Sequence, residues 1–216
     1  MKFKLKYEVI SFLAILAVAV FSVYFYLNAP DLVPSHWNFQ GEVDDYSSKT
    51  FIAIFGPVLT LGLYLLFWLL PKIDPKKERY AEFAGVYAIF RTVIIVFLAG
   101  IFLVTGLAGL GYDVNIAKIV PLAVGVLFVT MGYFLDRVKS NWFVGIRTPW
   151  TLSSETVWQK THRLGRYTFM IAGVVFAGGA FLAETKFYPH IFIGAILLAA
   201  VAPVVYSYLL YRGEKH

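Results

Sequence analysis

Long apolar stretches separated by short polar segments run through the whole chain. Six of them hold about 20 residues each, enough to cross the hydrocarbon core of a bilayer. They cover residues 8–28, 51–70, 86–111, 117–135, 167–183 and 187–210. Because lipid offers the backbone no hydrogen-bond partner, such stretches form helices, and their continuous rather than alternating apolar character argues against a β-barrel. The pattern predicts an all-α membrane helix bundle with six transmembrane helices.

The composition supports this class. Of the 216 residues, 59% are hydrophobic and 15% are charged, and the mean hydropathy is +0.71, well above that of a soluble domain. The chain has no cysteine, which excludes disulfides, thiolate nucleophiles and cysteine-bound metals; neither a cofactor nor a metal is expected. The basic N-terminus resembles a signal peptide, but its apolar run is long enough to span and lacks a suitable cleavage site. We interpret it as a retained first helix.

Basic residues are distributed unevenly between the connections. Under a six-span arrangement most of the 19 Lys and Arg residues fall on one side, whereas Lys49, Lys118 and Lys186 fall on the other. Basic connections stay in the cytoplasm, so both termini and the fourth connection are predicted to be cytoplasmic in a multi-pass plasma-membrane protein. The net charge of +6 then reflects topology and anionic lipid head groups, and no direct binding of nucleic acid is expected.

Charged residues within the spans would mark functional sites, because they are costly in lipid. The predicted spans hold no Asp, Glu, Lys or His near the middle of the membrane, and Arg91 lies near the start of the third. We expect its side chain to extend to the cytoplasmic interface. The sequence also has no HExxH, GxSxG or P-loop pattern, so it contains none of these catalytic motifs of hydrolases.

The first connection, residues 30–49, is acidic and rich in turn-forming residues. Pro34 and Gly41 are expected to fix turns, with His36 and Trp37 beside them and Asp44 following. His36 and the nearby carboxylates are residue types of a metal or pH-sensing site, but their spacing matches no ligand pattern. We favour a structural loop, with Trp37 at the outer interface and His36 hydrogen-bonded within the loop.

The fourth connection contains the sequence NWFVGIRTPWTL at residues 141–152. Gly145 permits a tight bend, and Thr148 before Pro149 favours extended backbone. The planar guanidinium of Arg147 can donate two parallel hydrogen bonds, and we expect it to bind either a partner or Glu155 in this way.

An amphipathic helix is expected to follow over residues 154–164, with Ser153 as its N-cap. Glu155 and His162 lie on its polar stripe, and Trp158 lies at the stripe's edge. Such a helix serves either as an interfacial anchor on lipid or as a docking surface, and the pattern alone favours neither.

These residues resemble the signature of the SdpI family of bacterial membrane immunity proteins. The family pattern N-x-x-x-G-I-R-T-P-W-T-L, followed by E-x-x-W-x-x-T-H-x-x-G, is matched at Asn141, Gly145, Arg147, Thr148, Pro149, Trp150, Glu155, Trp158, Thr161, His162 and Gly165. The first connection is similar to a small membrane domain often found ahead of that signature, with the pattern P-x-H-[WF]-x-x-x-G-x-x-D at Pro34, His36, Trp37, Gly41 and Asp44.

The resemblance implies a non-enzymatic protein that gives resistance to a secreted peptide toxin and signals to a cytoplasmic transcriptional repressor. It implies a toxin contact at the first connection and a partner site at the fourth, which also includes Trp142. The expected organisation is an N-terminal helix hairpin over residues 1–70 and a four-helix region over residues 71–216. Two alternatives stay open: a transporter of small or amphiphilic compounds, and a membrane enzyme using Glu155 and His162 as acid and base.

Overall fold

The computed structural model describes residues 5–182 and 188–214. The described structure is 76% helical, which confirms the predicted all-α class. The elements in chain order are α1 (Leu5–Asn28), β1 (Leu32–Trp37), β2 (Val43–Ser48), α2 (Lys49–Ile73), the 3-10 helix η1 (Lys77–Ala81), α3 (Ala84–Gly109), α4 (Ile116–Leu135), α5 (Pro149–Ser153), α6 (Glu155–Gly179) and α7 (Tyr188–Glu214).

Five of these helices are long and apolar enough to cross a membrane, namely α1, α2, α3, α4 and α7. The protein is therefore a multi-pass membrane protein. The fifth predicted span, residues 167–183, begins inside α6, and its last residue lies outside the described part. Residues 155–164, which were predicted to form a separate amphipathic helix, are the first part of the same helix. Because that part is polar, α6 as a whole does not reach the hydropathy of the other long helices.

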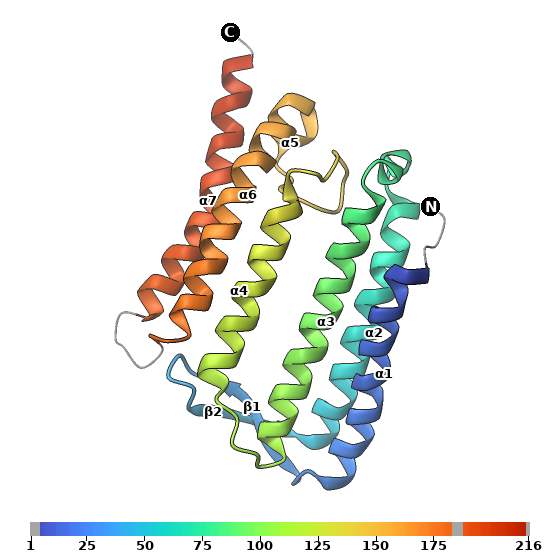
Figure 1. The fold of residues 1–216 in the computed structure, drawn as a ribbon, viewed down its shortest axis with the longest axis vertical. Coiled ribbons are helices and arrows are strands. Elements are labelled where there is room, and N and C mark those ends of the chain that lie inside the picture. Colours follow the sequence, from blue (N-terminus) through green and yellow to red (C-terminus); the bar gives the residue numbers. More distant parts are fainter. Residues whose placement is uncertain (1–4, 183–187, 215–216) are drawn as a thin grey trace.

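The long helices form two groups, as Figure 1 shows. Helix α1 packs on α2 and α3, while α6 packs on α4 and α7, and α3 and α4 connect the groups. The backbones of α4 and α6 approach closely, since a Cβ atom on Gly125 would lie 2.6 Å from the carbonyl oxygen of Gly173. Small residues at this crossing let the two backbones meet, as is common in membrane bundles.

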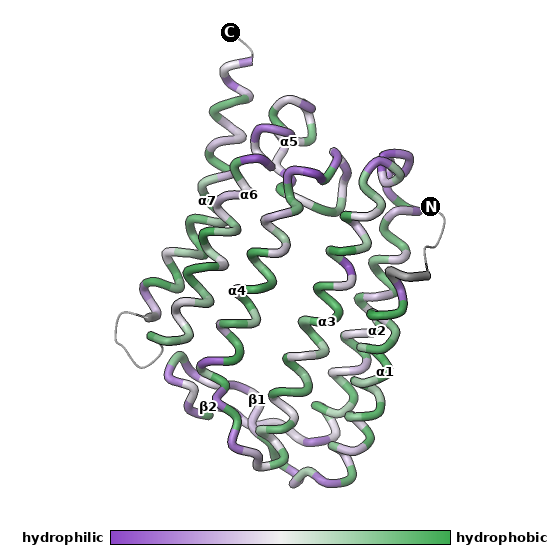
Figure 2. The backbone as a smooth tube through the Cα atoms, in the orientation of Figure 1, coloured by the Kyte–Doolittle hydropathy of each residue, from purple (hydrophilic) through white to green (hydrophobic). Residues whose placement is uncertain are grey.

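The bundle has two polar ends. The antiparallel strands β1 and β2 and the α3–α4 connection lie at one end, the hairpin end. The other end carries η1, residues 136–148, α5 and the end of α7, and we refer to it as the basic end. Figure 2 shows that hydrophilic residues gather at both ends and that the helices between the ends consist mainly of hydrophobic residues. This distribution suits a protein that presents one end to each side of a bilayer.

Arg91 does not extend to the interface, so that prediction is wrong. Its side chain is 1% exposed and forms an ion pair with Glu8 of α1, which is 3% exposed. The Tyr64 hydroxyl of α2 donates a hydrogen bond of 2.7 Å to the same carboxylate. A counter-charge supplied by a neighbouring helix makes a buried guanidinium tolerable in the bundle.

Candidate functional site

At the basic end, a single buried amide organises the backbone of the loop that follows α4. The side-chain oxygen of Asn141 accepts hydrogen bonds from the backbone N–H groups of Phe143 (2.9 Å) and Val144 (2.7 Å). Its NH2 group donates to the carbonyl oxygens of Lys139 (2.8 Å) and Val144 (2.9 Å). Asn141 is fully buried. The side chain thus satisfies backbone groups that no helix or strand satisfies here.

The α2–α3 connection docks against this loop through Asp74, which is 2% exposed. One carboxylate oxygen of Asp74 accepts hydrogen bonds from the backbone N–H of Trp142 and from the Tyr80 hydroxyl, both at 2.9 Å. Burial, together with the bond to this carboxylate, raises the pKa of Tyr80 above its ordinary value. Lys76 adds a hydrogen bond of 2.7 Å from its Nζ to the Ser140 Oγ. The two helix groups are therefore joined by polar contacts at the basic end.

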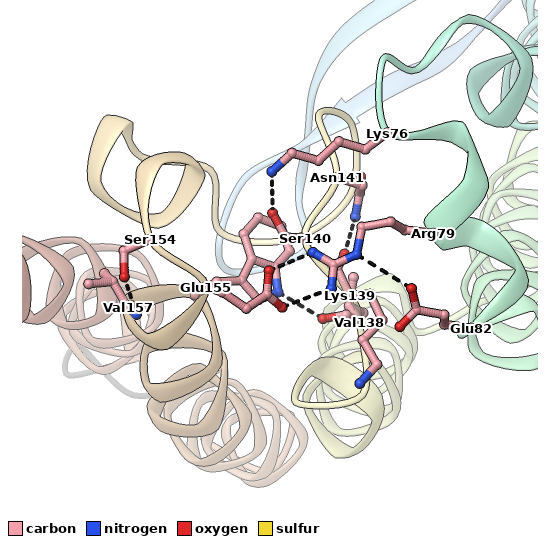
Figure 3. Close-up of polar contacts among 11 residues, drawn as sticks. Lys76, Arg79, Glu82, Val138, Lys139, Ser140, Asn141, Ser154, Glu155 and Val157 are labelled. Atoms are coloured by element: carbon pink, nitrogen blue, oxygen red, sulfur yellow. Dashed lines mark hydrogen bonds and ion pairs between the residues drawn. The ribbon is translucent and has the colours of Figure 1, made fainter.

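A two-point ion pair strengthens this junction. Arg79 of η1 donates to the two carboxylate oxygens of Glu155, at 2.5 Å and 3.1 Å, as Figure 3 shows. These bonds hold the pKa of Glu155 below its ordinary value. Arg147 does not pair with Glu155, one of the two partners considered for it, because Arg79 occupies that carboxylate. Arg147 instead donates to the carbonyl oxygen of Trp142 (2.8 Å) and is otherwise exposed.

His162 is buried between the loop and its own helix. Its Nε2 accepts a hydrogen bond of 3.0 Å from the backbone N–H of Ile146, and its Nδ1 lies 2.8 Å from the carbonyl oxygen of Trp158. Both contacts are satisfied by the neutral ring with its proton on Nδ1. Burial lowers the pKa of His162 to about 4. The ring also stacks on the indole of Trp158, with centroids 4.0 Å apart, and that indole donates to the carbonyl oxygen of Val138 (2.8 Å).

Gly145 fits this arrangement in two ways. Its φ of +111° lies in the region that favours glycine. A Cβ atom at this position would lie 2.4 Å from Nε2 of His162. The bend expected from the sequence is present, and glycine is the residue that permits it.

Helix α5 is capped by Thr148, whose side chain accepts a hydrogen bond from the backbone N–H of Thr151. The Thr148 hydroxyl also lies 3.0 Å from that of Ser207, so α5 is held against α7. Ser154, not Ser153, is the N-cap of α6. The hydroxyl of Ser153 donates to the carbonyl oxygen of Pro149 instead, since Ser153 is the last residue of α5.

The predicted site residues at the basic end are therefore buried, exposed or half-buried. The buried ones are Asn141, Thr148, Trp158, Thr161 and His162, and all of them except Thr161 join segments of this end through side-chain hydrogen bonds. The exposed ones are Trp142, which is 46% exposed, Arg147 and Pro149. Trp150 is half-buried, with its ring 5.0 Å from that of Tyr208, and Glu155 is half-buried against Arg79.

Sequence reasoning missed the partners of these residues. Asp74, Lys76, Arg79 and Tyr80 were not expected at the site, although they lie in one short charged segment between two spans. That clustering was the available signal. It could not identify partners more than 60 residues away along the chain.

At the hairpin end, the predicted structural loop is a two-stranded sheet. His36 of β1 and Asp44 of β2 join the strands, with Nδ1 and Oδ1 2.5 Å apart. Gly41 lies in the turn with a φ of +82°, whereas Pro34 lies inside β1 and not in a turn. Among the described residues no three His, Asp or Glu side chains gather as a metal site.

Trp37 separates two apolar cavities beneath this hairpin. One, of about 280 Å³, lies between the hairpin, α4 and α7. The other, of about 210 Å³, lies between the hairpin, α2 and α3. Trp37 therefore contributes to both helix groups at the hairpin end.

Comparisons with known proteins agree with the resemblance noted in the sequence. Residues 137–207 match the model of the SdpI/YfhL protein family, and residues 13–61 match a domain of unknown function. The chain is 29% identical over 208 residues to a protein of Bacillus subtilis (strain 168) named Immunity protein SdpI, covering 96% of this chain and 97% of that one. No solved structure matches.

Proposed function

Because this chain belongs to the SdpI family of membrane proteins, we propose that it is an immunity protein that protects its cell from a secreted peptide toxin. The observation that carries the proposal is the match to Immunity protein SdpI along nearly the whole of both chains. An alignment of that extent includes both polar ends of the bundle, and not only its apolar helices.

The hairpin end is the proposed contact for the toxin. The connection carries acidic residues (Asp31, Glu42, Asp44 and Asp45). It also exposes apolar side chains, with Phe39 43% and Tyr46 58% exposed. A cationic amphipathic peptide meets complementary charge on such a surface. The cavities on both sides of Trp37 offer space for its apolar side chains.

The basic end is the proposed site of the intracellular response. The excess of Lys and Arg residues at this end supports a cytoplasmic location. Trp142 and Arg147 are exposed there on a loop whose backbone is fixed from inside by Asn141. Aromatic and Arg side chains on a rigid support are typical of protein interfaces. A cytoplasmic repressor is the partner that this surface is proposed to bind.

The two alternative functions have less support. For an enzyme using Glu155 and His162, the carboxylate is occupied by Arg79, and both ring nitrogens of the buried His162 are hydrogen-bonded within the protein. For a transporter, the cavities beneath the hairpin are lined largely by apolar residues. The buried Glu8–Arg91 pair is internally neutralised, unlike the unpaired acids that couple ions to transport.

Deleting the gene and challenging the cells with peptides secreted by their own species tests the proposal. Cells without the protein should stop growing at peptide concentrations that the parent strain tolerates, and a plasmid copy should restore growth. Equal growth of both strains at every concentration would refute the immunity role.

The two ends can then be separated by variants. Asp44→Ala or His36→Ala should lower binding of the active peptide to the purified protein. Arg147→Lys should leave that binding unchanged but reduce recruitment of a cytoplasmic partner to membranes, because Lys keeps the charge and loses the planar fork. Full recruitment by the Lys variant would refute the proposed role of Arg147.

A further inference from the structure

A polar hollow of about 510 Å³ lies at the basic end, between the end of α4 and the start of α6. Its lining includes four cations, Lys139, Lys160, Arg163 and Arg166, and two carboxylates, Asp136 and Glu155. We refer to it as the basic hollow.

The two carboxylates do not neutralise this hollow, because each is already paired. Asp136 accepts a hydrogen bond of 2.8 Å from Arg166, and Glu155 is bound by Arg79 from η1. Lys139, Lys160 and Arg163 form no ion pair with any residue in the described ranges 5–182 and 188–214. In Figure 3 the side chain of Lys139 extends away from the Arg79–Glu155 pair. Three cations therefore face one hollow without a counter-charge.

A second hollow, of about 430 Å³, lies on the same pair of helices closer to the hairpin end. Its lining is apolar and includes Leu122, Val126, Val129, Val174, Gly178 and Phe181. We refer to it as the apolar hollow.

The two hollows lie on one side of the α4–α6 pair. Positions 122, 126, 129 and 133 of α4 are separated by three or four residues, and so are positions 163, 167, 171, 174 and 178 of α6. Residues at such spacing share a helix face. Tyr167 lines the basic hollow, and the guanidinium of Arg166 is 5.1 Å from the ring centre of Tyr133 and 6.0 Å from that of Tyr167. A continuous surface therefore runs from a cationic pocket to an apolar groove within membrane depth.

We propose that this surface binds one anionic phospholipid, with its phosphate in the basic hollow and an acyl chain along the apolar hollow. Arg163, Lys139 and Lys160 would supply charge-assisted hydrogen bonds to the phosphate oxygens. Tyr133 and Tyr167 would meet the lipid head group, as aromatic residues at a membrane interface do. The proposal does not depend on toxin immunity, since it rests on charge and shape at the α4–α6 surface alone.

Binding can be measured on the intact protein in a neutral detergent, by native mass spectrometry during titration with phosphatidylglycerol. We expect one saturable adduct, with phosphatidylcholine binding at least tenfold more weakly. The triple variant Lys139→Gln/Lys160→Gln/Arg163→Gln should weaken phosphatidylglycerol binding by roughly a hundredfold, as expected for three basic residues at an anionic surface. The matched control Lys72→Gln/Lys77→Gln/Arg212→Gln removes three cations from the same end outside the hollow, and it should bind within twofold of the parent.

A second pair of variants distinguishes a lipid from free phosphate. A Cβ atom on Gly178 would meet no atom within 4 Å, and the same holds for Gly62 on α2. Gly178→Phe should fill the apolar hollow and weaken phosphatidylglycerol binding at least tenfold, whereas Gly62→Phe should not. Equal loss in the two triple variants would overturn the defined site in favour of a general surface potential. Unchanged lipid affinity in Gly178→Phe, or full competition by inorganic phosphate, would overturn the acyl-chain contact.

Discussion

Gly145 and His162 constrain each other at the scale of single residues. Gly145 has a positive φ, which glycine adopts without strain. Because glycine has no Cβ atom, the imidazole Nε2 that accepts a hydrogen bond from the Ile146 N–H can lie next to it. The histidine in turn must stay neutral to accept that bond. Two substitutions test this relationship from its two sides.

Gly145→Ala should destabilise the protein by about 2–4 kcal/mol, since it combines backbone strain with a Cβ that collides with the ring. Thermal unfolding in detergent measures this. Gly194→Ala in α7 is the matched control, because a Cβ there meets no atom within 4 Å; it should be neutral or stabilising by up to about 1 kcal/mol. Equal unfolding temperatures for the two variants would contradict the steric argument.

The low pKa of His162 predicts a pH dependence of stability. Its folded value of about 4 lies below the unfolded value of about 6.5, so the unfolded chain binds a proton first as the pH falls. Stability is therefore complete above pH 6.5 and decreases as the pH falls towards 4, by about 3 kcal/mol in all. As the pH is lowered from 7.5 to 5, the unfolding temperature of the parent protein should fall. The unfolding temperature of His162→Gln should fall much less. A slope of the same size in the variant would assign the effect to other groups.

At the scale of elements, the contact between α1, α2 and α3 depends on a buried charge pair. Glu8 and Arg91 lie on different helices and are covered from solvent, and Tyr64 of α2 completes the hydrogen bonding of the carboxylate. Pairing of this kind fixes how three otherwise apolar helices align, because other alignments leave a charge without its partner.

Arg91→Met alone should destabilise the bundle by about 3–5 kcal/mol, because it leaves the Glu8 carboxylate buried without its partner. The double variant Arg91→Met/Glu8→Gln should recover much of that loss. A double-mutant cycle on unfolding in detergent measures the coupling. If the two single losses simply add, the pair does not hold α1 against α3.

The helices themselves were predictable, and the reason is local. A run of about 20 apolar residues is visible without knowing its neighbours, so the ranges 51–70 and 117–135 lie within α2 and α4. The continuity of α6 was missed, because an amphipathic helix was predicted to end at residue 164 and a separate span to begin at residue 167. Gly165 gives space to Ile146, whose Cδ1 would lie 2.5 Å from an added Cβ. Contacts that link distant segments, such as Arg79 with Glu155, leave no local pattern and could not be inferred.

At the scale of the whole molecule, the two polar ends should face opposite sides of the membrane. Gln40 is exposed in the hairpin turn, and Glu78 is exposed in η1 at the basic end. Because the chain has no cysteine, a single Cys at either position reports its side without interference. A membrane-impermeant thiol reagent should label Gln40→Cys in intact cells and label Glu78→Cys only after lysis. Labelling of Glu78→Cys from outside would invert the topology and the proposed roles of the two ends.

The junction at Asp74 also has a consequence for biogenesis. Trp142, whose backbone N–H covers the carboxylate, lies 68 residues later in the chain. At roughly 5–20 residues per second of synthesis, Trp142 is made about 3–14 s after Asp74. The delay between Arg79 and Glu155 is longer, because these residues lie further apart in the chain. Helices α1–α3 are therefore made before the basic end can close over them. A chain truncated before α6 would lack Glu155, Trp158 and His162, and with them the contacts that complete that end.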